Sequence, residues 1–459
     1  MSAPARPAPT APRPYNFPAV ERALMANGVR LVVAPMPRLP LVTVLALVDA
    51  GASTDLRGRE GLAALTARTL TEGIAGLDGA ALTDRFESMG TSVDAYADWD
   101  STVMRFTVTP TQLDAAFALF CDVLRAPSFP EPDVARRRDE RLASLEQRLS
   151  EPRGLADQRF SGFLYGPSSR YGRPVGGTKA SVTPLDAAQV RAFHAARYAP
   201  AVTSLIFVGD ITVGEAQRLA ERRLGDWTVA GRPSETGENR QREATRHAFI
   251  VDKADAPQSE LRVGHVGVPR SDPKHLDIVV MNALLGGLFS SRINLNLRER
   301  HAFTYGASSG FDWRRDAGPF VVSAAVKSEI THRAVEEILL EIDGMRAAPP
   351  SASELALATD YLAGVFPIRY ESTDAVAGAI ANAVIFSLPD DWFATYRERV
   401  QAVSATDVHA VANSHLDPTR LQIVAVGDAT VIGESLAALP VGPVKVVAAA
   451  DDPAGTNPS

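Results

Sequence analysis

An internal repeat is the feature that most constrains how this chain can fold. One copy begins at Val182 and reads VTPLDAAQVRAFHAARYAPAVTSLIFVGD; the other begins at Val403 and reads VSATDVHAVANSHLDPTRLQIVAVGD. Both copies predict a helix, a proline-containing turn and a strand that ends in Gly-Asp. Their separation, roughly 220 residues, is too long for a solenoid repeat and fits a duplicated domain.

The two halves around this repeat have the same predicted order of elements. Helices alternate irregularly with strands in each half, which predicts two tandem, homologous α/β-sandwich domains of the α+β class, with helices mostly on one face of each sheet. The polar, turn-rich stretch AGRPSETGENRQREATRH lies between them. We therefore expect an N-terminal domain at 17–230, a linker at 231–247 and a C-terminal domain at 248–445. Predicted strands include NGVRLVV, STVMRFTV, SLIFVGD, ELRVGHVGV and GPFVVSAAV.

Composition excludes several classes of function. Of the 459 residues, 46% are hydrophobic and the formal net charge is -7. Lys and Arg are scattered among acidic residues, so we expect neither nucleic acid nor an anionic membrane as a partner. No apolar run reaches the length of a membrane span. The Pro/Ala-rich stretch at 1–18 lacks the apolar core of a signal peptide, which predicts a disordered lead-in and a cytoplasmic or periplasmic protein.

The usual catalytic residue types form no complete set in the sequence. None of the eight histidines has a second His or a Glu at the spacing of H-E-x-x-H or H-x-x-E-H. His194 and His409 suit ordinary helix packing, and Cys121 is in register with apolar neighbours, so it is expected in a core. The stretch RRRDERLASLEQRLSE is interpreted as a solvated helix face with charge pairs.

The stretch GLAALTARTLTEG, at 61–73, predicts a helix with almost no chemically active group. Leu62, Leu65 and Thr69 recur at spacings of three and four, which places them on one helical face. The alanines between them suit close packing. The stretch therefore predicts a framework helix.

The stretch LLGGLFSSRINLNLRERHAFTYGASSGFDW, in the second half, has a simple local interpretation. Gly286 and Gly287 end a helix, Arg298 solvates the end of a second short helix, and Tyr305 begins a strand. Considered alone, these residues need no further role.

Several short motifs together resemble a known family. They are VDAGA before the framework helix, YGRPVGGT at 171–178, PQSEL at 257–261, LRERHAFTYG at 297–306 and the two Gly-Asp strand ends. From about Val29 to Asp428 the chain resembles the pitrilysin- and insulinase-like zinc metallopeptidases, the inverzincins, in their bacterial two-domain form and in the subunits of the mitochondrial processing peptidase. The resemblance implies that one chain forms half of a clamshell.

The resemblance also implies that this chain has lost a metal site. In catalytic members the framework helix reads G-L-A-H-x-x-E-H, and a later Glu completes the zinc coordination. The matching positions here are Ala64, Ala67, Arg68 and about Ser144. Methyl groups and a guanidinium do not coordinate zinc. We therefore expect no metal or other cofactor in this chain, and zinc in a partner subunit.

The resemblance further implies what the chain retains. Arg298 and Tyr305 match a pair that acts on substrate at the zinc site of the other subunit, and Gly286 and Gly287 match a glycine loop linked to substrate binding. The chain is then the non-catalytic subunit of a heterodimeric oligopeptidase for short unfolded peptides, similar to the alpha subunit of the processing peptidase. Its partner would carry H-x-x-E-H. Two alternatives remain open: a structural scaffold protein of this fold, and a homodimeric peptide-binding protein without a hydrolytic partner.

Overall fold

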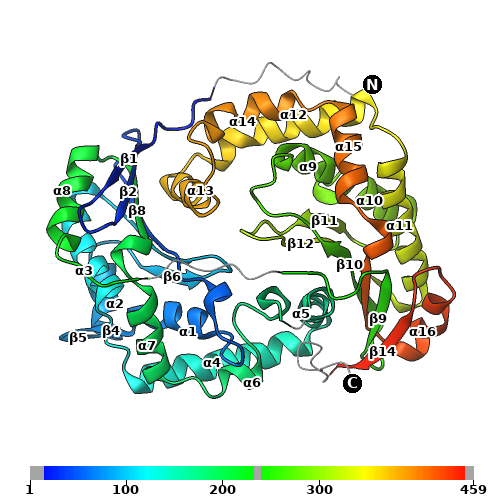
Figure 1. The fold of residues 1–459 in the computed structure, drawn as a ribbon, viewed down its shortest axis with the longest axis horizontal. Coiled ribbons are helices and arrows are strands. Elements are labelled where there is room, and N and C mark those ends of the chain that lie inside the picture. The colour runs from blue at the N-terminus through cyan, green and yellow to red at the C-terminus, as the bar shows by residue number, and fades with distance from the viewer. Residues whose placement is uncertain (1–14, 167, 232–238, 450–459) are drawn as a thin grey trace, which may run out of the picture.

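The chain folds around two mixed sheets that face each other across the molecule (Figure 1). The computed structural model describes residues 15–166, 168–231 and 239–449. The first six-stranded sheet has the order β1-β2-β8-β3-β7-β6, with bounds Glu21–Leu24, Arg30–Pro35, Thr203–Gly209, Val42–Val48, Thr102–Val108 and Asp94–Ala97. The second has the order β14-β9-β13-β10-β12-β11, with bounds Val444–Ala448, His247–Asp252, Gln422–Gly427, Gln258–Val266, Pro319–Lys327 and Ala307–Phe311.

The two sheets have equivalent topologies, which confirms the predicted pair of α/β domains. In the first sheet β8 is parallel to β2 and antiparallel to β3. In the second sheet β13 is parallel to β9 and antiparallel to β10. The sheets differ at one edge, where β1 runs antiparallel to β2 but β14 runs parallel to β9.

Burial on both faces explains the sequence of the central strands. Every residue of β3 is buried. Val42, Val44 and Ala46 belong to one core, while Leu45 and Leu47 belong to a second core on the opposite face. A strand that is covered on both faces reads as a continuous apolar run, as β3 does.

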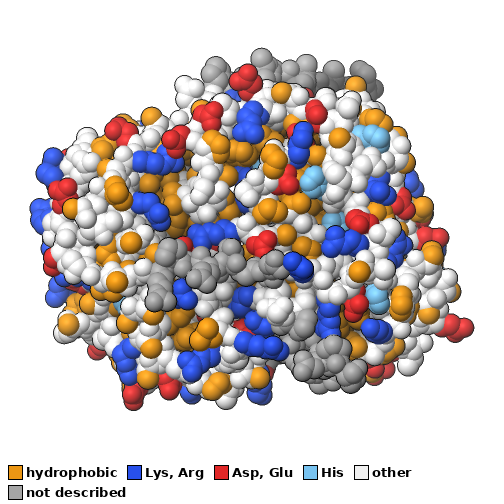
Figure 2. All heavy atoms as spheres, in the orientation of Figure 1, with side chains coloured by type: hydrophobic (Ala, Val, Ile, Leu, Met, Phe, Trp, Pro, Cys, Tyr) orange, Lys and Arg blue, Asp and Glu red, His pale blue; other side chains and the backbone are white. Residues whose placement is uncertain are grey.

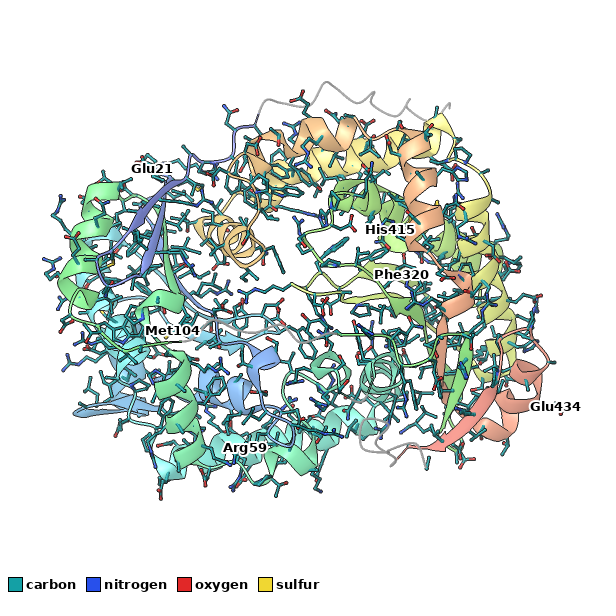
Figure 3. All side chains as sticks on the ribbon, viewed as in Figure 1. Glu21, Arg59, Met104, Phe320, His415 and Glu434 are labelled. Atoms are coloured by element: carbon teal, nitrogen blue, oxygen red, sulfur yellow. The ribbon has the colours of Figure 1, made fainter. Side chains whose placement is uncertain are left out.

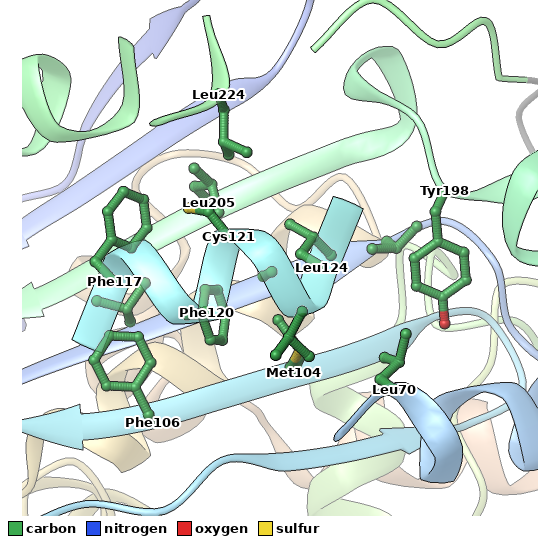
Figure 4. Close-up of a cluster of buried hydrophobic side chains, with 14 of the residues drawn as sticks. Leu70, Met104, Phe106, Phe117, Phe120, Cys121, Leu124, Tyr198, Leu205 and Leu224 are labelled. Atoms are coloured by element: carbon green, nitrogen blue, oxygen red, sulfur yellow. The ribbon is translucent and has the colours of Figure 1, made fainter. Parts of the chain in front are cut away.

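Helices of the first half cover one face of the first sheet. Figure 4 shows α3 over β7 and β8, with the side chain of Phe120 directed toward Met104 and Phe106. The Phe117 ring packs on the other side, against Phe207 of β8, with centroids 5.3 Å apart. Cys121 is buried in this core, as expected from its register. The helices of this half that belong to the first domain are α1 (Leu62–Thr69), α2 (Gly79–Ser88), α3 (Leu113–Arg125), α4 (Glu131–Ser150), α6 (Lys179–Val182), α7 (Ala187–Arg197) and α8 (Val213–Leu224).

The second half builds an equivalent layer of helices on its own sheet. Figure 3 shows Met104 and Phe320 within the two sheets, whereas Arg59 and Glu434 lie at the periphery. The helices of this layer are α9 (His275–Asn282), α10 (Arg292–Asn294), α11 (Thr331–Ala347), α12 (Ala352–Arg369), α14 (Trp392–Gln401), α15 (Ala405–His415) and α16 (Ala429–Ala437).

The remaining two helices are exchanged between the halves. Helix α5 (Pro152–Leu164) packs on β10 and β13 of the second sheet, where the rings of Phe163 and Phe249 stack with centroids 4.1 Å apart. Helix α13 (Thr373–Ile385) packs on β3 and β8 of the first sheet. Each sheet is therefore covered on its second face by a helix from the other half. The boundaries predicted at 17–230, 231–247 and 248–445 stay a prediction, and residues 232–238 of the linker lie outside the described residues.

The run His275–Arg300 is the one described helical segment that is long and apolar enough to span a membrane by length and composition alone, with a hydropathy of 1.4. In this fold 56% of that window is buried. Leu276, Val280 and Met281 pack in the core of the second domain, and this packing accounts for their apolar character.

Candidate functional site

Helix α1 presents small residues and one guanidinium to a pocket, and it buries its apolar face. Leu62 and Leu65 are buried in the core of the first domain, as their spacing predicts. The Thr69 hydroxyl donates to the carbonyl of Leu65 at 2.8 Å, inside the helix. Ala64 is half-buried and Arg68 is exposed. The opposite face of α1 is thus free to form a site wall.

A buried carboxylate fixes the start of α1. Asp55 accepts hydrogen bonds from the backbone N–H groups of Gly61, at 2.8 Å, and Ala63, at 2.9 Å. These are N–H groups that the first turn of a helix leaves unpaired. Asp55 also forms a buried ion pair with Arg170, with 3.1 Å between Oδ2 and Nη2. Arg170 immediately precedes the YGRPVGGT motif.

The YGRPVGGT motif holds α1 through a second ion pair and a close backbone contact. Arg173 Nε lies 2.6 Å from a carboxylate oxygen of Glu60. Gly177 has a φ of +73°, and a Cβ atom there would lie 2.1 Å from the carbonyl oxygen of Glu60. Only glycine allows this approach. The YGRPVGGT motif therefore fixes the position of α1. The sequence of the motif alone does not predict this role.

A pocket of about 580 Å³ lies over the exposed face of α1, and we call it the arginine pocket. Its walls come from α1, from the edge strand β6, from α4 and from the YGRPVGGT segment. Figure 2 shows Lys and Arg side chains gathered along the lower rim of the molecule, where α4 lies in Figure 1. The lining residues are Ala64, Ala67, Arg68, Thr71, Val93, Asp94, Ala95, Tyr96, Ala97, Arg105, Arg137, Arg141, Arg148, Val175 and Gly176.

The structure brings three of the four positions matched to the zinc ligands and the water-activating Glu into this pocket. Ala64, Ala67 and Arg68 line it, whereas Ser144 is exposed on α4 and is not among the lining residues. The α4 residues at the pocket are arginines at 137, 141 and 148. Their spacings of four and seven place them on one helical face, a signal that is present in the sequence. The prediction of a purely solvated face is incomplete here, because these three arginines line the pocket.

Arg298 lies in the π-helical turn Leu295–Arg300 of the second domain. Its guanidinium carbon lies 4.4 Å from the centre of the Phe289 ring, and its Nε lies 3.5 Å from a carboxylate oxygen of Glu299. Phe289 is itself 70% exposed. Arg298 therefore lies at the surface, supported by an exposed aromatic ring.

Tyr305 is 96% exposed. It was expected to begin a strand, but β11 begins at Ala307. The hydroxyl of Thr304 bonds to both the N–H and the C=O of Gly306, and this local turn delays the strand. No hydrogen bond, ion pair or cation–π contact joins Tyr305 to Arg298 within the described part of the chain.

Gly286 and Gly287 end a π-helical turn that packs against β11. A Cβ atom at Gly286 would lie 2.5 Å from the backbone nitrogen of Ser309, and one at Gly287 would lie 2.9 Å from the side-chain nitrogen of Asn282. Close packing therefore explains why glycine is needed at Gly286. A role of either glycine in substrate binding stays a prediction.

Two family profiles match most of the chain. The profile described as Insulinase (Peptidase family M16) matches residues 32–163, and the profile described as Peptidase M16 inactive domain matches residues 184–362. The chain belongs to the M16 peptidase family. Its two sheets correspond to the N-terminal and C-terminal domains of that family.

Relatives of this M16 chain align with most of its length, and solved structures share its fold. An uncharacterized zinc protease of Streptomyces coelicolor is 24% identical over 412 residues, which are 88% of each chain. A probable mitochondrial-processing peptidase subunit beta of Arabidopsis thaliana is 21% identical, over 90% of this chain and 79% of the plant protein. The crystal structure of a peptidase M16 inactive domain from Pseudomonas fluorescens superposes with a TM-score of 0.84 at 26% identity, covering 89% of this chain and 98% of that one.

The residues at α1 of this M16 chain do not fit a zinc ion. Ala64 and Ala67 offer no donor atom, and the Arg68 guanidinium carries a positive charge. Among the described residues, no group of three or more His, Cys, Asp or Glu side chains is placed to hold a metal ion. The pocket can instead attract a negatively charged group.

A second pocket, of about 610 Å³, lies between the two domains of the M16 chain, and we call it the aromatic pocket. Its aromatic lining residues are Trp99, Phe311, Trp313, Phe366, Tyr370, Phe386, Trp392, Phe393 and Tyr396. His275, at the start of α9, has its ring 4.1 Å from that of Trp313, centre to centre. Burial lowers the pKa of His275 to about 2, with a further contribution from Arg270 and Arg399. The imidazole is therefore neutral at physiological pH.

Proposed function

We propose that this chain is the non-catalytic subunit of a heterodimeric zinc metallo-oligopeptidase and that it supplies Arg298 and Tyr305 to substrate at the partner's zinc. The observation that carries the proposal is the exposure of Tyr305, at 96%, on a chain whose own α1 offers no metal ligand. A side chain so exposed makes its functional contacts outside its own subunit or not at all. The partner would be an M16 homologue that carries H-x-x-E-H.

The chemistry of the two side chains suits this role. A phenol hydroxyl and a guanidinium can hold a peptide carbonyl and stabilise the oxyanion that develops when zinc-activated water attacks it. Each hydrogen-bond donor directed at such a charge commonly lowers the activation free energy by about 3 kcal/mol. In the isolated chain Arg298 is 35% exposed and Tyr305 is almost fully exposed, so both groups are accessible to a partner-bound peptide.

The surface around Arg298 supports contact with another subunit. Phe289, at 70%, and Leu295, at 44%, are exposed on the same helical run that carries Arg298. Large apolar side chains exposed close together are typical of protein-binding surfaces. The named relatives, a zinc protease and a processing-peptidase subunit, support the placement of this chain in a peptidase assembly.

The test is co-expression with an M16 homologue that carries H-x-x-E-H, followed by size-exclusion chromatography, zinc analysis and hydrolysis of short peptides. The dialysed chain alone should hold no stoichiometric zinc and cleave no peptide, while the mixture should be active. In the heterodimer, Arg298→Ala and Tyr305→Phe should each lower kcat/KM by roughly one hundredfold. Assembly and zinc content should not change.

Matched controls use residues of the same types far from this segment in sequence. Tyr361→Phe alters a half-exposed tyrosine of α12, and Arg218→Ala alters an exposed arginine of α8. Both should leave kcat/KM within a factor of two of the parent. If the Arg298→Ala and Tyr305→Phe heterodimers assemble and keep the parental activity, Arg298 and Tyr305 are ordinary surface residues. A chain that forms no active complex would instead favour the scaffold or the peptide-binding protein.

A further inference from the structure

The arginine pocket carries an excess of positive charge. Its lining includes the guanidinium groups of Arg68, Arg105, Arg137, Arg141 and Arg148, against one carboxylate, that of Asp94. The chain as a whole has a net charge of -7, so this local sign is opposite to that of the protein. The charge available to a ligand depends on how many of these five arginines are paired with carboxylates.

Two of the five arginines have carboxylate partners. Arg137 lies 2.5 Å from an oxygen of the buried Glu72 and 2.9 Å from one of Glu140. Arg105 lies 2.9 Å from Asp374, at the start of the exchanged helix α13, and 3.9 Å from Asp94. These two groups form the neutralised side of the pocket.

The other three arginines lack an equivalent partner. Among the described residues, Arg68 has no hydrogen bond or ion pair, and Arg141 has no carboxylate within reach. Arg148 lies 3.8 Å from Asp157, whose other oxygen is 2.7 Å from the buried Arg262. Up to three positive charges therefore face the pocket without a full counter-charge.

Arg141 is the best positioned of the three. Its Nε donates to the carbonyl of Gly176 at 2.9 Å, which leaves both terminal nitrogens for another acceptor. A Cβ atom at Gly176 would lie 2.2 Å from one of those nitrogens, so glycine allows the guanidinium to lie in this place. Burial, together with the nearby Arg148 and Arg68, lowers the pKa of Arg141. An anion between these groups would relieve their repulsion.

We propose that the arginine pocket is a carboxylate-binding site and that Arg68 and Arg141 hold the C-terminal carboxylate of a short peptide. Guanidinium groups bind carboxylates through paired, charge-assisted hydrogen bonds. Another wall is β6, the edge strand of the first sheet, and within the described residues one side of its backbone is paired with no strand. That wall suits an extended peptide better than a free ion.

The choice of a peptide as the occupant rests on the proposed function, whereas the site itself does not. Binding can be measured on the isolated full-length chain, without a partner, zinc or hydrolysis. A failure of the heterodimer to assemble or to cleave would therefore not alter the result at this pocket.

The experiment compares two five-residue peptides of the same sequence, each with an N-terminal fluorophore, one with a free C-terminal carboxylate and one with a C-terminal amide. Fluorescence anisotropy should show roughly tenfold tighter binding of the acid than of the amide, and this preference should weaken as salt is added. Arg68→Gln and Arg141→Gln should each abolish the preference. Arg141→Lys, which keeps the charge but not the paired donors, should retain part of it.

Arg218→Gln, on α8 away from the pocket, is the matched control and should keep the full preference. Circular dichroism and the unfolding midpoint of each variant separate a lost site from a lost fold. Equal affinity for acid and amide in the parent chain would overturn the proposal, as would an equal loss in Arg218→Gln. Inorganic phosphate that binds through Arg141, with no binding of the peptide acid, would overturn the assignment to a carboxylate.

Discussion

Helices α1 and α9 occupy equivalent places in the two domains, yet the pockets beside them differ in chemistry. Each helix follows an equivalent central strand, β3 in the first sheet and β10 in the second. The arginine pocket beside α1 is lined by five guanidinium groups. The aromatic pocket beside α9 is lined by nine aromatic side chains together with arginines and aspartates, and its histidine is neutral because it is buried.

The difference shows that the shared topology determines where a pocket lies, whereas the side chains of each domain determine its chemistry. Helix α1 is fixed at its start by charged groups, Asp55 with Arg170 and Glu60 with Arg173. The start of α9 is fixed by contacts between rings, His275 with Trp313 and Trp392. Two copies of one backbone arrangement thus tolerate a charged anchor, built from ion pairs, and an anchor built from ring contacts.

The largest expected effect tests the polar anchor. Asp55→Ala removes the carboxylate that caps α1 and leaves the Arg170 guanidinium buried without its partner. We expect the free energy of unfolding of the full-length chain to fall by about 3 to 5 kcal/mol, measured by urea denaturation.

The control for that prediction is an exposed ion pair in the same domain. Arg125 lies 2.7 Å from Asp226, whose side chain is 76% exposed. Asp226→Ala should cost less than about 1 kcal/mol, because solvent already screens the pair. Similar losses in the free energy of unfolding for Asp55→Ala and Asp226→Ala would mean that the buried ion pair of Asp55 stabilises the fold no more than an exposed one.

An intermediate effect tests the neutral histidine of the apolar anchor. The pKa of His275 is about 2 in the folded chain, below the value of about 6.5 expected in the unfolded chain. The unfolded chain therefore binds a proton first as the pH falls, and the folded state loses stability below about pH 6.5. Between pH 7.5 and pH 5 the parent should lose about 2 kcal/mol more than His275→Leu. Parallel pH profiles for the two proteins would show that His275 is solvated.

The smallest expected effect concerns Tyr305, beyond the end of the run that begins with α9. Because its side chain is 96% exposed, Tyr305→Ser should change the free energy of unfolding by less than about 0.5 kcal/mol. Tyr165→Phe provides the contrast, since it removes a buried hydroxyl that donates to the carbonyl of Ala317 at 2.9 Å, and should cost about 1 kcal/mol. A large loss in Tyr305→Ser would place this side chain in a structural role within its own chain.

Local pattern in the sequence was sufficient for the elements and the duplication. The repeat at Val182 and Val403 corresponds to α7 with β8 and to α15 with β13. The alternating and apolar runs became β7, β10 and β12, and the framework helix became α1. These features depend on residues a few positions apart, so hydrophobic periodicity and turn residues determine them.

Tertiary structure alone decided how distant segments meet. The exchange of α5 and α13 has no local signal, because each helix packs on strands that lie far from it in the sequence. The arginine pocket joins Arg68 of α1, Arg105 of β7 and Arg141 of α4, which lie tens of residues apart and converge only when α4 packs across α1. The sequence predicts a degenerate metal site at Ala64, Ala67 and Arg68, because methyl groups offer no donor atom and a guanidinium is positively charged in any fold. The positive charge of the pocket could not be predicted from the sequence. It is the sum of charges on α1, β7 and α4, and only the folded chain brings these charges together.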